Sequence, residues 1–564
     1  MGRKAEGKAA RRAAVIVGGG IGGLASAILL SRRGYRAIVL ERDRRPDVDS
    51  PEAAFRSWDR AGLPQFRHSH VFLARITSAL RERLPEVLGL LQRNGALELP
   101  LTIAVPPGLD LGPRVKGDGE LVLLGCRRAA FEWALRKAAA STRGVELREG
   151  VLVEELRASR TEGGVPRVTG VEWRELGNDT RPSAGIAWQP RKTKLREDGR
   201  TRRIDADLVI DASGRRSPAP QWLQKIGAAA PHETTVPTGI FYFTRFYRLV
   251  GPRPGGAATG LVAGDLGWIK LATFPGDGDT FSITVGTSID DEPLRALADP
   301  EVFEAIVRAF PQVGVWRAPG VSRPIDGPDT PVLVMGGLSN RRRRFVRDGR
   351  PIVTGFFPLG DAAYHSNPIY GRGATSAVLG AIALDDALGA HQDDLGAALV
   401  AYDAQLRREI EPFWDAAAAG DRASAARAAE AAKGDSSWLP DPRELLDPGR
   451  VLSRLLARAA GVYFERGLVP ASRRDGDVFR AVMRVMNMLD SPRDGLASPQ
   501  VVARVLPFIA ESLFRGVEPN FVGPTRDEAL ALVARAKRRR RTTARAKKAL
   551  PALLDAGSEV AGHA

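Results

Sequence analysis

The chain has 564 residues, enough for two or three domains, and its content of 44% hydrophobic and 26% charged residues is typical of a soluble globular protein. Its single cysteine, Cys126, excludes a disulfide framework and a cysteine-rich metal site, and it fits the reducing cytoplasm, where we place the protein. The formal net charge of +17 is concentrated at both chain ends and in the arginine run at 341–344. We interpret the terminal runs as solvated tails. The alternative is contact with anionic lipid or nucleic acid; we expect no nucleic-acid partner and retain only contact with a membrane surface.

The first sixty residues begin with a pattern typical of a βαβ unit. An apolar run at residues 13–17 predicts a buried parallel strand, and small and apolar residues at 24–33 predict a packed helix. Gly34 stands where a helix-terminating glycine is expected, and an apolar run at 36–40 predicts the next strand. The basic residues before this segment imitate a secretory signal, but glycines interrupt its apolar stretch. No other apolar run is long enough to predict a membrane span.

A glycine fingerprint joins the first predicted strand to the helix. Gly18 permits the tight turn, Gly20 lets the backbone approach a pyrophosphate, and Gly23 lets the helix pack on the strand. The helix N-terminus then faces the negative charge of the phosphates. Glu41 ends the second strand, where it can accept hydrogen bonds from both ribose hydroxyls, and Arg42 follows as a further nucleotide contact. The unit predicts dinucleotide binding without choosing between NAD and FAD.

Two later segments supply further loops at the ends of strands. Residues 207–217 predict a buried strand that is closed by a turn with Asp211 and Gly214. Further along, Gly360 and Asp361 follow another predicted strand. The carboxylate of Asp361 is thereby placed to accept a hydrogen bond from the ribityl chain of a flavin.

The loop after Asp361 leads into an alanine-rich helix at about 377–389. Pro368 fixes the loop, and Gly371 and Gly373 can present backbone N–H groups beside a flavin ring. This segment, with Arg372 between the two glycines, is the candidate catalytic region.

In this order, the three fingerprints resemble those of FAD-dependent monooxygenases of the para-hydroxybenzoate hydroxylase and squalene epoxidase group. Residues 62–70 are similar to the GxPQxRHxH segment of bacterial FAD epoxidases that act on polyene precursors of polyether antibiotics. The resemblance runs from about residue 12 to residue 510, with an insertion near 176–200. It implies an α/β fold with a Rossmann-like FAD-binding domain of the glutathione-reductase type, an antiparallel β-sheet substrate domain and a helical C-terminal extension.

The resemblance also implies roles for residues outside the fingerprints. Arg127 begins a helix that matches the family's arginine-led helix, whose arginine contacts the flavin side chain or pyrophosphate; Arg128 is the alternative for this role. Arg67 and His70 are implied to lie near the flavin or the substrate. His68 and His70 form a His-x-His pair, but no further cluster has ligand spacing, so we expect no metal site.

The predicted organisation has four parts. They are a discontinuous FAD-binding domain at 12–225 and 335–410 with a substrate-domain segment at about 65–120, a β-sheet substrate domain at 226–334, a helical C-terminal region at 411–530, and a basic tail at 531–564. In the sheet region, Tyr242 and Phe243 are candidates for lining a substrate pocket, with ordinary sheet core as the alternative. Helical segments are expected at 416–432, 450–466, 477–490 and 499–515. The last of these could lie on a membrane surface.

The function implied by the resemblance is that of an FAD-dependent monooxygenase in specialised metabolism. As an epoxidase or hydroxylase it would use a flavin C4a-hydroperoxide, formed with molecular oxygen, on a hydrophobic alkene or aromatic substrate. No second strand–GxGxxG–helix unit is found, so the electrons are expected from NAD(P)H that docks transiently or from a partner flavin reductase. The arginines at 341–344 are interpreted as a solvated loop, with a contact to a cofactor phosphate as the alternative.

One departure from the polyene epoxidases concerns Arg372 and Ala374, where those enzymes usually carry Gln or His followed by Met. A fixed cation here could raise the flavin potential, favour a flavin peroxide, or bridge to an acidic neighbour. Other functions remain open: a flavin-dependent halogenase, although its WxWxIP segment is missing, a flavin reductase or desaturase, and an inactive flavoprotein acting as a basic binding protein.

Overall fold

The computed structural model describes residues 12–106, 108–160, 164–177, 200–254, 261–433, 458–516 and 521–540. The described residues form two compact units. The first draws on the segments Met1–Thr238, Gly276–Gly278 and Gly337–Glu518, and the second on Gly239–Pro275, Asp279–Gly336 and Pro519–Ala564. Most of the insertion expected near 176–200 and the N-terminal basic run up to residue 11 lie outside the described residues. Within the described ranges, no helix combines the length and apolar character that a membrane crossing requires.

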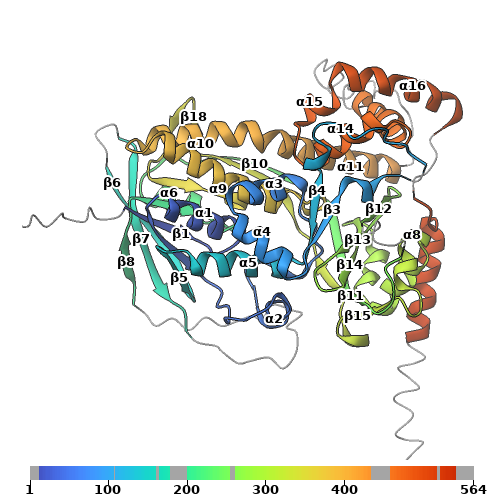
Figure 1. The fold of residues 1–564 in the computed structure, drawn as a ribbon, viewed down its shortest axis with the longest axis horizontal. Helices are drawn as coiled ribbons and strands as arrows, with labels where there is room; N and C mark the ends of the chain where they lie inside the picture. Colours follow the sequence, from blue (N-terminus) through green and yellow to red (C-terminus); the bar gives the residue numbers. More distant parts are fainter. Residues whose placement is uncertain are drawn as a thin grey trace, which may run out of the picture. The chain divides into compact units, whose positions relative to one another are not determined.

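A five-stranded parallel sheet forms the centre of the first unit (Figure 1). In spatial order its strands are β20 (Phe356–Pro358), β9 (Leu208–Asp211), β1 (Ala13–Val17), β2 (Arg36–Glu41) and β5 (Val145–Glu149). Their register aligns the strand ends, because Val17 pairs with both Leu40 and Asp211, and Asp211 pairs with Pro358. The loops that follow these strands therefore leave the sheet at one edge.

Both faces of this sheet are covered, which explains why β1, β9 and β20 are largely apolar and buried, unlike the polar strand β5. Val15, on one face, packs in a core with Val171 and Trp173 of a three-stranded antiparallel sheet. Ile16 points to the other face, where its side chain lies close to Gly23 at the start of the first helix. The antiparallel sheet consists of β6 (Val151–Arg160), β7 (Pro166–Glu175) and β8 (Arg202–Asp205). The helices are α1 (Ile21–Arg32), α5 (Arg128–Ser141) and α9 (Gly373–Ala390).

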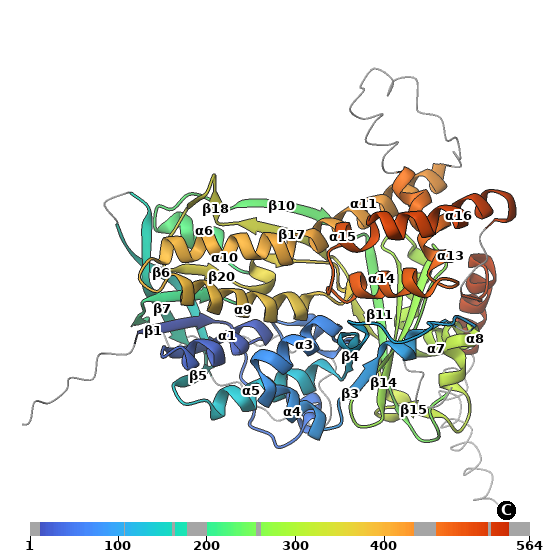
Figure 2. The same ribbon diagram turned by 45° about the horizontal axis from the view of Figure 1, so that its top comes forward.

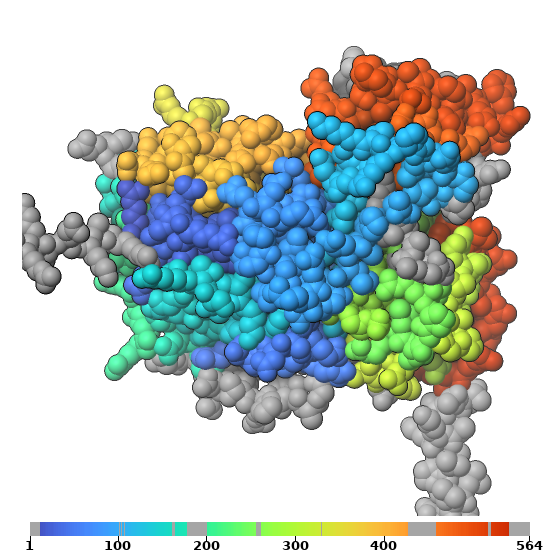
Figure 3. Space-filling view, viewed as in Figure 1, coloured from blue at the N-terminus to red at the C-terminus, as the bar shows by residue number. Residues whose placement is uncertain are grey.

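The C-terminal part of the first unit is helical. Helix α9 packs against α10, and α11 continues along the chain beyond it (Figure 2). The further helices are α10 (Leu395–Glu409), α11 (Glu411–Lys433), α14 (Gly476–Met486), α15 (Pro492–Leu496) and α16 (Pro499–Arg515). The helices expected at 416–432 and 499–515 are confirmed, and the one expected at 477–490 is present but ends at Met486. The first part of the helix expected at 450–466 lies outside the described residues. The α16 segment lies at the surface (Figure 3), with Phe514 89% exposed; its membrane contact stays a prediction.

A second antiparallel sheet belongs to the second unit. Its strands are β12 (Val262–Asp265), β13 (Ile269–Pro275), β14 (Thr280–Ser288), β11 (Ile240–Leu249) and β15 (Ser322–Pro324), with β16 (Leu333–Met335) also paired to β11. Residues 526–540 form a helix, and Ala529, Val533 and Ala536 are buried in the core of this unit. Residues 531–540 therefore belong to the fold of this unit through Val533 and Ala536, whereas the basic side chains at 537–540 are exposed, as expected of a solvated run; residues 541–564 lie outside the described residues. The fold class predicted from the sequence is confirmed: a Rossmann-like α/β domain, an antiparallel sheet and C-terminal helices.

Candidate functional site

The three fingerprints meet at the carboxyl edge of the parallel sheet. The Gly18 N–H donates to the Leu40 carbonyl at 2.8 Å, which joins the loops after β1 and β2. Two further backbone bonds, from Ala212 to Val17 at 2.9 Å and from Leu359 to Asp211 at 2.8 Å, join the loops after β1, β9 and β20. Ligands of open α/β sheets bind at this edge, so we take it as the candidate site.

The three glycines of the first fingerprint differ in what a side chain would meet at their positions. Gly18 has φ +107°, and a Cβ there would lie 2.4 Å from the Ala212 carbonyl oxygen. A Cβ on Gly23 would lie 1.9 Å from the Gly18 oxygen, because α1 packs directly on this turn. Gly20 is the N-cap of α1, and a Cβ there would meet nothing within 4 Å. Gly18 and Gly23 are thus required by the fold, whereas Gly20 leaves the helix N-terminus open to a phosphate group.

Glu41 at the end of β2 is buried and held from several sides. Its carboxylate accepts hydrogen bonds from the backbone N–H groups of Gly19 at 2.7 Å and Asp43 at 2.8 Å. Burial alone would raise the pKa of Glu41, but the charges of Arg60 and Arg45 and the two backbone donors hold it below its ordinary value. The carboxylate is therefore ionised at neutral pH, the form that accepts hydrogen bonds from a ribose.

Arg60 is the centre of a buried ion network that the sequence did not indicate. Its guanidinium lies 3.4 Å from Glu41, 3.2 Å from Asp43 and 3.1 Å from Glu132 on α5. The Arg60 side chain is only 5% exposed, and this burial strengthens its electrostatic interaction with the three acids. Arg42, by contrast, is 45% exposed and lies 3.5 Å from Asp43, so its nucleotide contact stays a prediction.

The loop after β9 is built around Asp211. This buried carboxylate accepts hydrogen bonds at 2.5 Å from the hydroxyls of both Ser213 and Ser217, and burial raises its pKa. Gly214 has φ +85°, which closes the turn in a conformation that favours glycine. Among the described residues, the hydrogen bonds of the Asp211 carboxylate stay within its own turn, and its contact with a cofactor stays a prediction.

Asp361 follows β20 and lies beside the start of α9. Gly360 before it has φ +60°, and a Cβ on Gly373 would lie 3.9 Å from the Asp361 carboxylate. The side chain of Asp361 is 21% exposed, and its carboxylate is 4.0 Å from the His365 ring. The carboxylate and the N-terminus of α9 are therefore brought together, as the sequence predicts for a flavin-binding loop.

Arg372 is buried at the N-terminus of α9. It donates to the Phe413 carbonyl at 2.7 Å, and its guanidinium lies over the rings of Tyr370 and Phe413 at 4.8 and 5.4 Å. Burial lowers its pKa to about 10. In the described part of the chain no carboxylate pairs with it, so the structure does not support an acidic bridge. Its effect on a flavin stays a prediction.

Arg127 and Arg67, which the resemblance places near the flavin, are both engaged by protein groups. Arg127 binds the carboxylate of Asp277 with Nη2 at 2.6 Å, and Nη1 reaches Glu52 at 2.8 Å. Arg67 donates to the backbone carbonyl of Phe55 at 3.0 Å, and burial lowers its pKa to about 10. These bonds fix the two side chains structurally, and their cofactor contacts stay predictions.

The histidine pair is neutral at physiological pH. Burial lowers the pKa of His68 to about 4, and burial with the charge of Arg128 lowers that of His70 to about 3. The His70 ring lies 3.4 Å from Arg128 and stacks on Phe72 with centroids 5.9 Å apart. Within the described ranges, no three His, Cys, Asp or Glu side chains are grouped as they would be around a metal ion.

The arginine run at 341–344 is not a solvated loop, so that expectation is wrong. It lies in β17 (Ser339–Arg344), which pairs with β10 (His232–Pro237). Arg342 binds Glu411 at 2.8 Å, and Arg343 binds Glu233 at 2.7 Å. Carboxylates that are distant in the sequence thus neutralise this arginine run, which the sequence alone suggests is solvated.

Tyr242 and Phe243 lie on opposite faces of β11. Phe243 is buried in the core of the second unit with Val285 and Phe303, as the sheet-core alternative expects. Tyr242 faces the other way beside Gly286, and its role in a substrate pocket stays a prediction.

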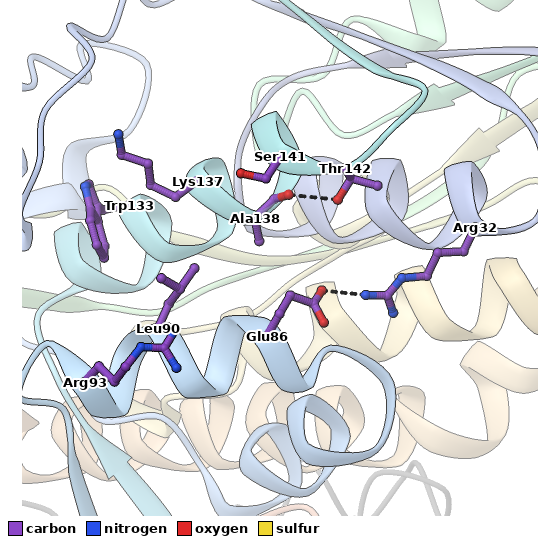
Figure 4. Close-up of a pocket in the computed structure, with 9 residues that line it drawn as sticks. All are labelled: Arg32, Glu86, Leu90, Arg93, Trp133, Lys137, Ala138, Ser141 and Thr142. Carbon is purple, nitrogen blue, oxygen red and sulfur yellow. Dashed lines mark hydrogen bonds and ion pairs between the residues drawn. The ribbon is translucent and has the colours of Figure 1, made fainter.

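A surface depression of about 590 Å³ lies among α1, α5 and α4 (Pro85–Arg93), with Trp133 and Leu90 in its lining (Figure 4). An ion pair of 2.6 Å between Arg32 and Glu86 borders it. Arg32 is the last residue of α1, roughly 16 Å along the helix from the glycine fingerprint at 1.5 Å rise per residue. The depression is therefore separate from the candidate site.

Comparison with known proteins agrees with this geometry. A family model described as NAD(P)-binding Rossmann-like domain matches residues 16–72. Protein Rv3254 of Mycobacterium tuberculosis is 29% identical over 429 residues, covering 72% of this chain and 80% of that protein. Kynurenine 3-monooxygenase of Xanthomonas oryzae pv. oryzae is 26% identical over 406 residues, covering 70% and 76%.

Solved structures of similar chains include PqsL from Pseudomonas aeruginosa, described as a probable FAD-dependent monooxygenase. It is 19% identical with a TM-score of 0.47, and the match covers 73% of this chain and 95% of that one. OxyS anhydrotetracycline hydroxylase from Streptomyces rimosus is 18% identical with a TM-score of 0.49, covering 85% and 76%.

The parallel sheet and the glycine fingerprint with Glu41 form a Rossmann-like domain of the FAD-binding type. In sequence the chain is similar to kynurenine 3-monooxygenases, which supports an oxidoreductase that uses FAD.

Proposed function

We propose that this protein is an FAD-dependent epoxidase or hydroxylase that acts on a hydrophobic alkene or aromatic small molecule in specialised metabolism. The observation that carries the proposal is the meeting of Gly20, Glu41, Asp211 and Asp361 at one edge of one sheet. The name of the kynurenine 3-monooxygenase relatives supports the reaction class. Similarity to polyene epoxidases, carried by residues 62–70, is the reason to include epoxidation.

The residues at this edge fit an FAD molecule. The open space in front of Gly20 leaves room for the pyrophosphate, and the ionised Glu41 beside it suits the adenosine ribose. Asp361, partly exposed next to Gly373, suits the hydroxyls of the ribityl chain. The bound flavin would supply the oxygen activation, whereas this chain would bind it, orient it and exclude water.

A test follows the fate of oxygen. The FAD-loaded protein is reduced anaerobically and then exposed to ¹⁸O₂ with a panel of polyenes and phenols. We expect one labelled oxygen atom in the product of at least one candidate. Release of one hydrogen peroxide per reduced flavin with every candidate would contradict the proposal, and a product that requires chloride or bromide would favour the halogenase alternative.

The electron donor is proposed to be NAD(P)H bound transiently or a flavin reductase. The described residues contain one glycine-fingerprint βαβ unit, at β1–α1–β2, and our proposal gives it to FAD. Stopped-flow reduction of the bound flavin by NADPH and by NADH, with and without a general flavin reductase, separates the two donors.

Replacing Asp361 by alanine is expected to weaken FAD binding by roughly 10- to 100-fold, because a hydrogen bond to a charged group contributes about 1.5–3 kcal/mol. The flavin content of the purified variant and its FAD titration measure this. Asp361→Asn, which keeps an oxygen acceptor, should lose less. Asp393→Ala, which removes an exposed carboxylate paired with Arg12, is the control. Full flavin retention by Asp361→Ala would show that the ribityl chain is bound elsewhere.

A further inference from the structure

Helix α11 makes several polar contacts with the proposed flavin loop, the segment 359–372 between β20 and α9. The Glu411 carboxylate accepts from the Tyr364 hydroxyl at 2.9 Å, and the Trp414 indole donates to the His365 carbonyl at 3.0 Å. The Phe413 carbonyl accepts from Arg372 at 2.7 Å. Figure 2 shows α11 following α10 next to β10 and β17. Nearly half of the residues of α11 are alanine and its sequence predicts no chemistry, yet its polar groups contact both ends of this loop.

Asp421, on the same helix, makes a further buried contact. It is 7% exposed, and its carboxylate accepts from the side-chain amides of Asn340 at 2.7 Å and Asn367 at 3.0 and 3.1 Å. The Tyr370 hydroxyl donates to it at 3.4 Å. The two asparagines are also bonded to each other, because the Asn367 N–H donates to the Asn340 side-chain oxygen at 2.8 Å. Asp421, Asn340 and Asn367 thus form a closed hydrogen-bonded ring.

Asn367 connects this ring to the turn that precedes α9. The Asn367 side-chain oxygen accepts from the Ile369 N–H at 3.2 Å and so caps the three-residue helix Pro368–Tyr370. Gly371 then takes a left-handed conformation with φ +65°, and α9 begins at Gly373. So short a turn has little stability of its own, and its shape depends on the groups that fix its first residue.

The carboxylate is chemically specific for this place. It accepts from two amide NH₂ groups at once, and a carboxylate has acceptor oxygens only. An amide at position 421 would turn one of its own N–H donors toward another donor. A buried donor left without an acceptor costs more than the bond itself contributes.

We propose that Asp421 is a positioning residue that holds the Asn367–Gly373 loop in the shape that meets the flavin ring. The inference rests on the proposed function, since it requires FAD at this edge of the sheet. It assigns to the C-terminal extension a part in the flavin site.

The test compares the two halves of the cofactor. Asp421→Asn and Asp421→Ala should weaken FAD binding at least about tenfold and shift the visible flavin spectrum. The affinity for ADP, which occupies only the Gly20 and Glu41 half, should stay within about twofold of the wild type. Asp415→Asn is the matched control, because Asp415 lies on the same helix and pairs with Arg342 but is 57% exposed.

A double substitution provides the rescue. Asn340→Asp combined with Asp421→Asn exchanges the carboxylate and the amide across their hydrogen bond. The new carboxylate at position 340 can accept from the new amide at 421 and from the Asn367 N–H, and the oxygen of that amide can accept from the Asn367 side chain. We expect the double variant to recover FAD affinity to within about threefold of the wild type, as coupled neighbours do.

Three outcomes would overturn the inference: wild-type FAD affinity in Asp421→Asn, equal losses of ADP and FAD affinity, or a double variant no better than Asp421→Asn. Each would mean that Asp421 acts only on overall stability or not at all. A wild-type protein that binds ADP but not FAD would instead overturn the proposed function itself. The two failures are thereby distinguished.

Discussion

The Gly23→Ala variant is expected to lose about 3 kcal/mol of unfolding free energy, at the upper end of the usual cost of overpacking, because the atoms that it meets cannot yield. The added Cβ would lie 1.9 Å from the Gly18 carbonyl oxygen, which is backbone and cannot rotate away. Helix α1 would have to move off β1, and this would disturb the turn on which the dinucleotide site depends. Urea unfolding of the cofactor-free protein measures the loss.

Gly20→Ala is the matched control three residues earlier. A Cβ there meets nothing within 4 Å, and Gly20 has φ −80° and ψ −169°, which any residue adopts. The stability of the cofactor-free variant should therefore stay within about 0.5 kcal/mol of the wild type. Its FAD affinity should nevertheless fall, since the methyl group would occupy the space proposed for the pyrophosphate. Equal stabilities of the two variants would contradict the packing role of Gly23.

Arg60→Met is expected to destabilise the protein by about 3–5 kcal/mol at pH 8, because removing one partner of a buried ion pair leaves uncompensated charge. Arg60 lies within 3.4 Å of Glu41, Asp43 and Glu132, and Glu41 and Glu132 are buried. Methionine keeps much of the volume, so the loss reports charge rather than packing. Urea unfolding at several pH values provides the measurement.

The pH dependence of this loss has a definite sign. In the wild type, burial would raise the pKa values of Glu41 and Glu132, but Arg60 and its neighbours hold both below their ordinary values. The two acids therefore stabilise the wild type above their unfolded-state pKa, and this contribution is lost as the pH falls through the folded-state values. Without Arg60, burial raises the same pKa values, so the penalty is largest at neutral and alkaline pH.

The difference between Arg60→Met and the wild type should accordingly shrink from pH 8 toward pH 4, as the acids become protonated. Arg56→Met is the control, since the Arg56 side chain is 42% exposed in its pair with Glu52 and should contribute under about 1 kcal/mol. A loss that is the same at pH 8 and pH 5 would show that Arg60 acts through packing.

Local patterns were enough to predict much of the fold. The strands at β1, β2 and β9 are short apolar runs, and the turn after β1 needs a glycine at a positive φ, a requirement that is visible in a single residue. The position of Glu41 in the site could also be predicted, because the residue that ends a parallel strand lies at the edge of the sheet where ligands bind. These features depend on neighbours in the chain, so spacing alone reveals them.

Partners distant in the sequence were not predictable. Arg60 binds Glu132, Arg342 binds Glu411, and Asp421 binds Asn340, across separations that no spacing rule covers. The arginine run at 341–344 looks solvated in the sequence for the same reason.

The nucleotide-binding βαβ unit, its glycines and the acid at its strand end could therefore be predicted from the residue order. The charges that neutralise Glu41 and the helix that contacts the loop before α9 became visible only in the folded chain. The physical reason is that periodicity and conformational preference act between adjacent residues, whereas a buried charge or amide is stabilised by whatever group the completed fold brings within about 3 Å of it.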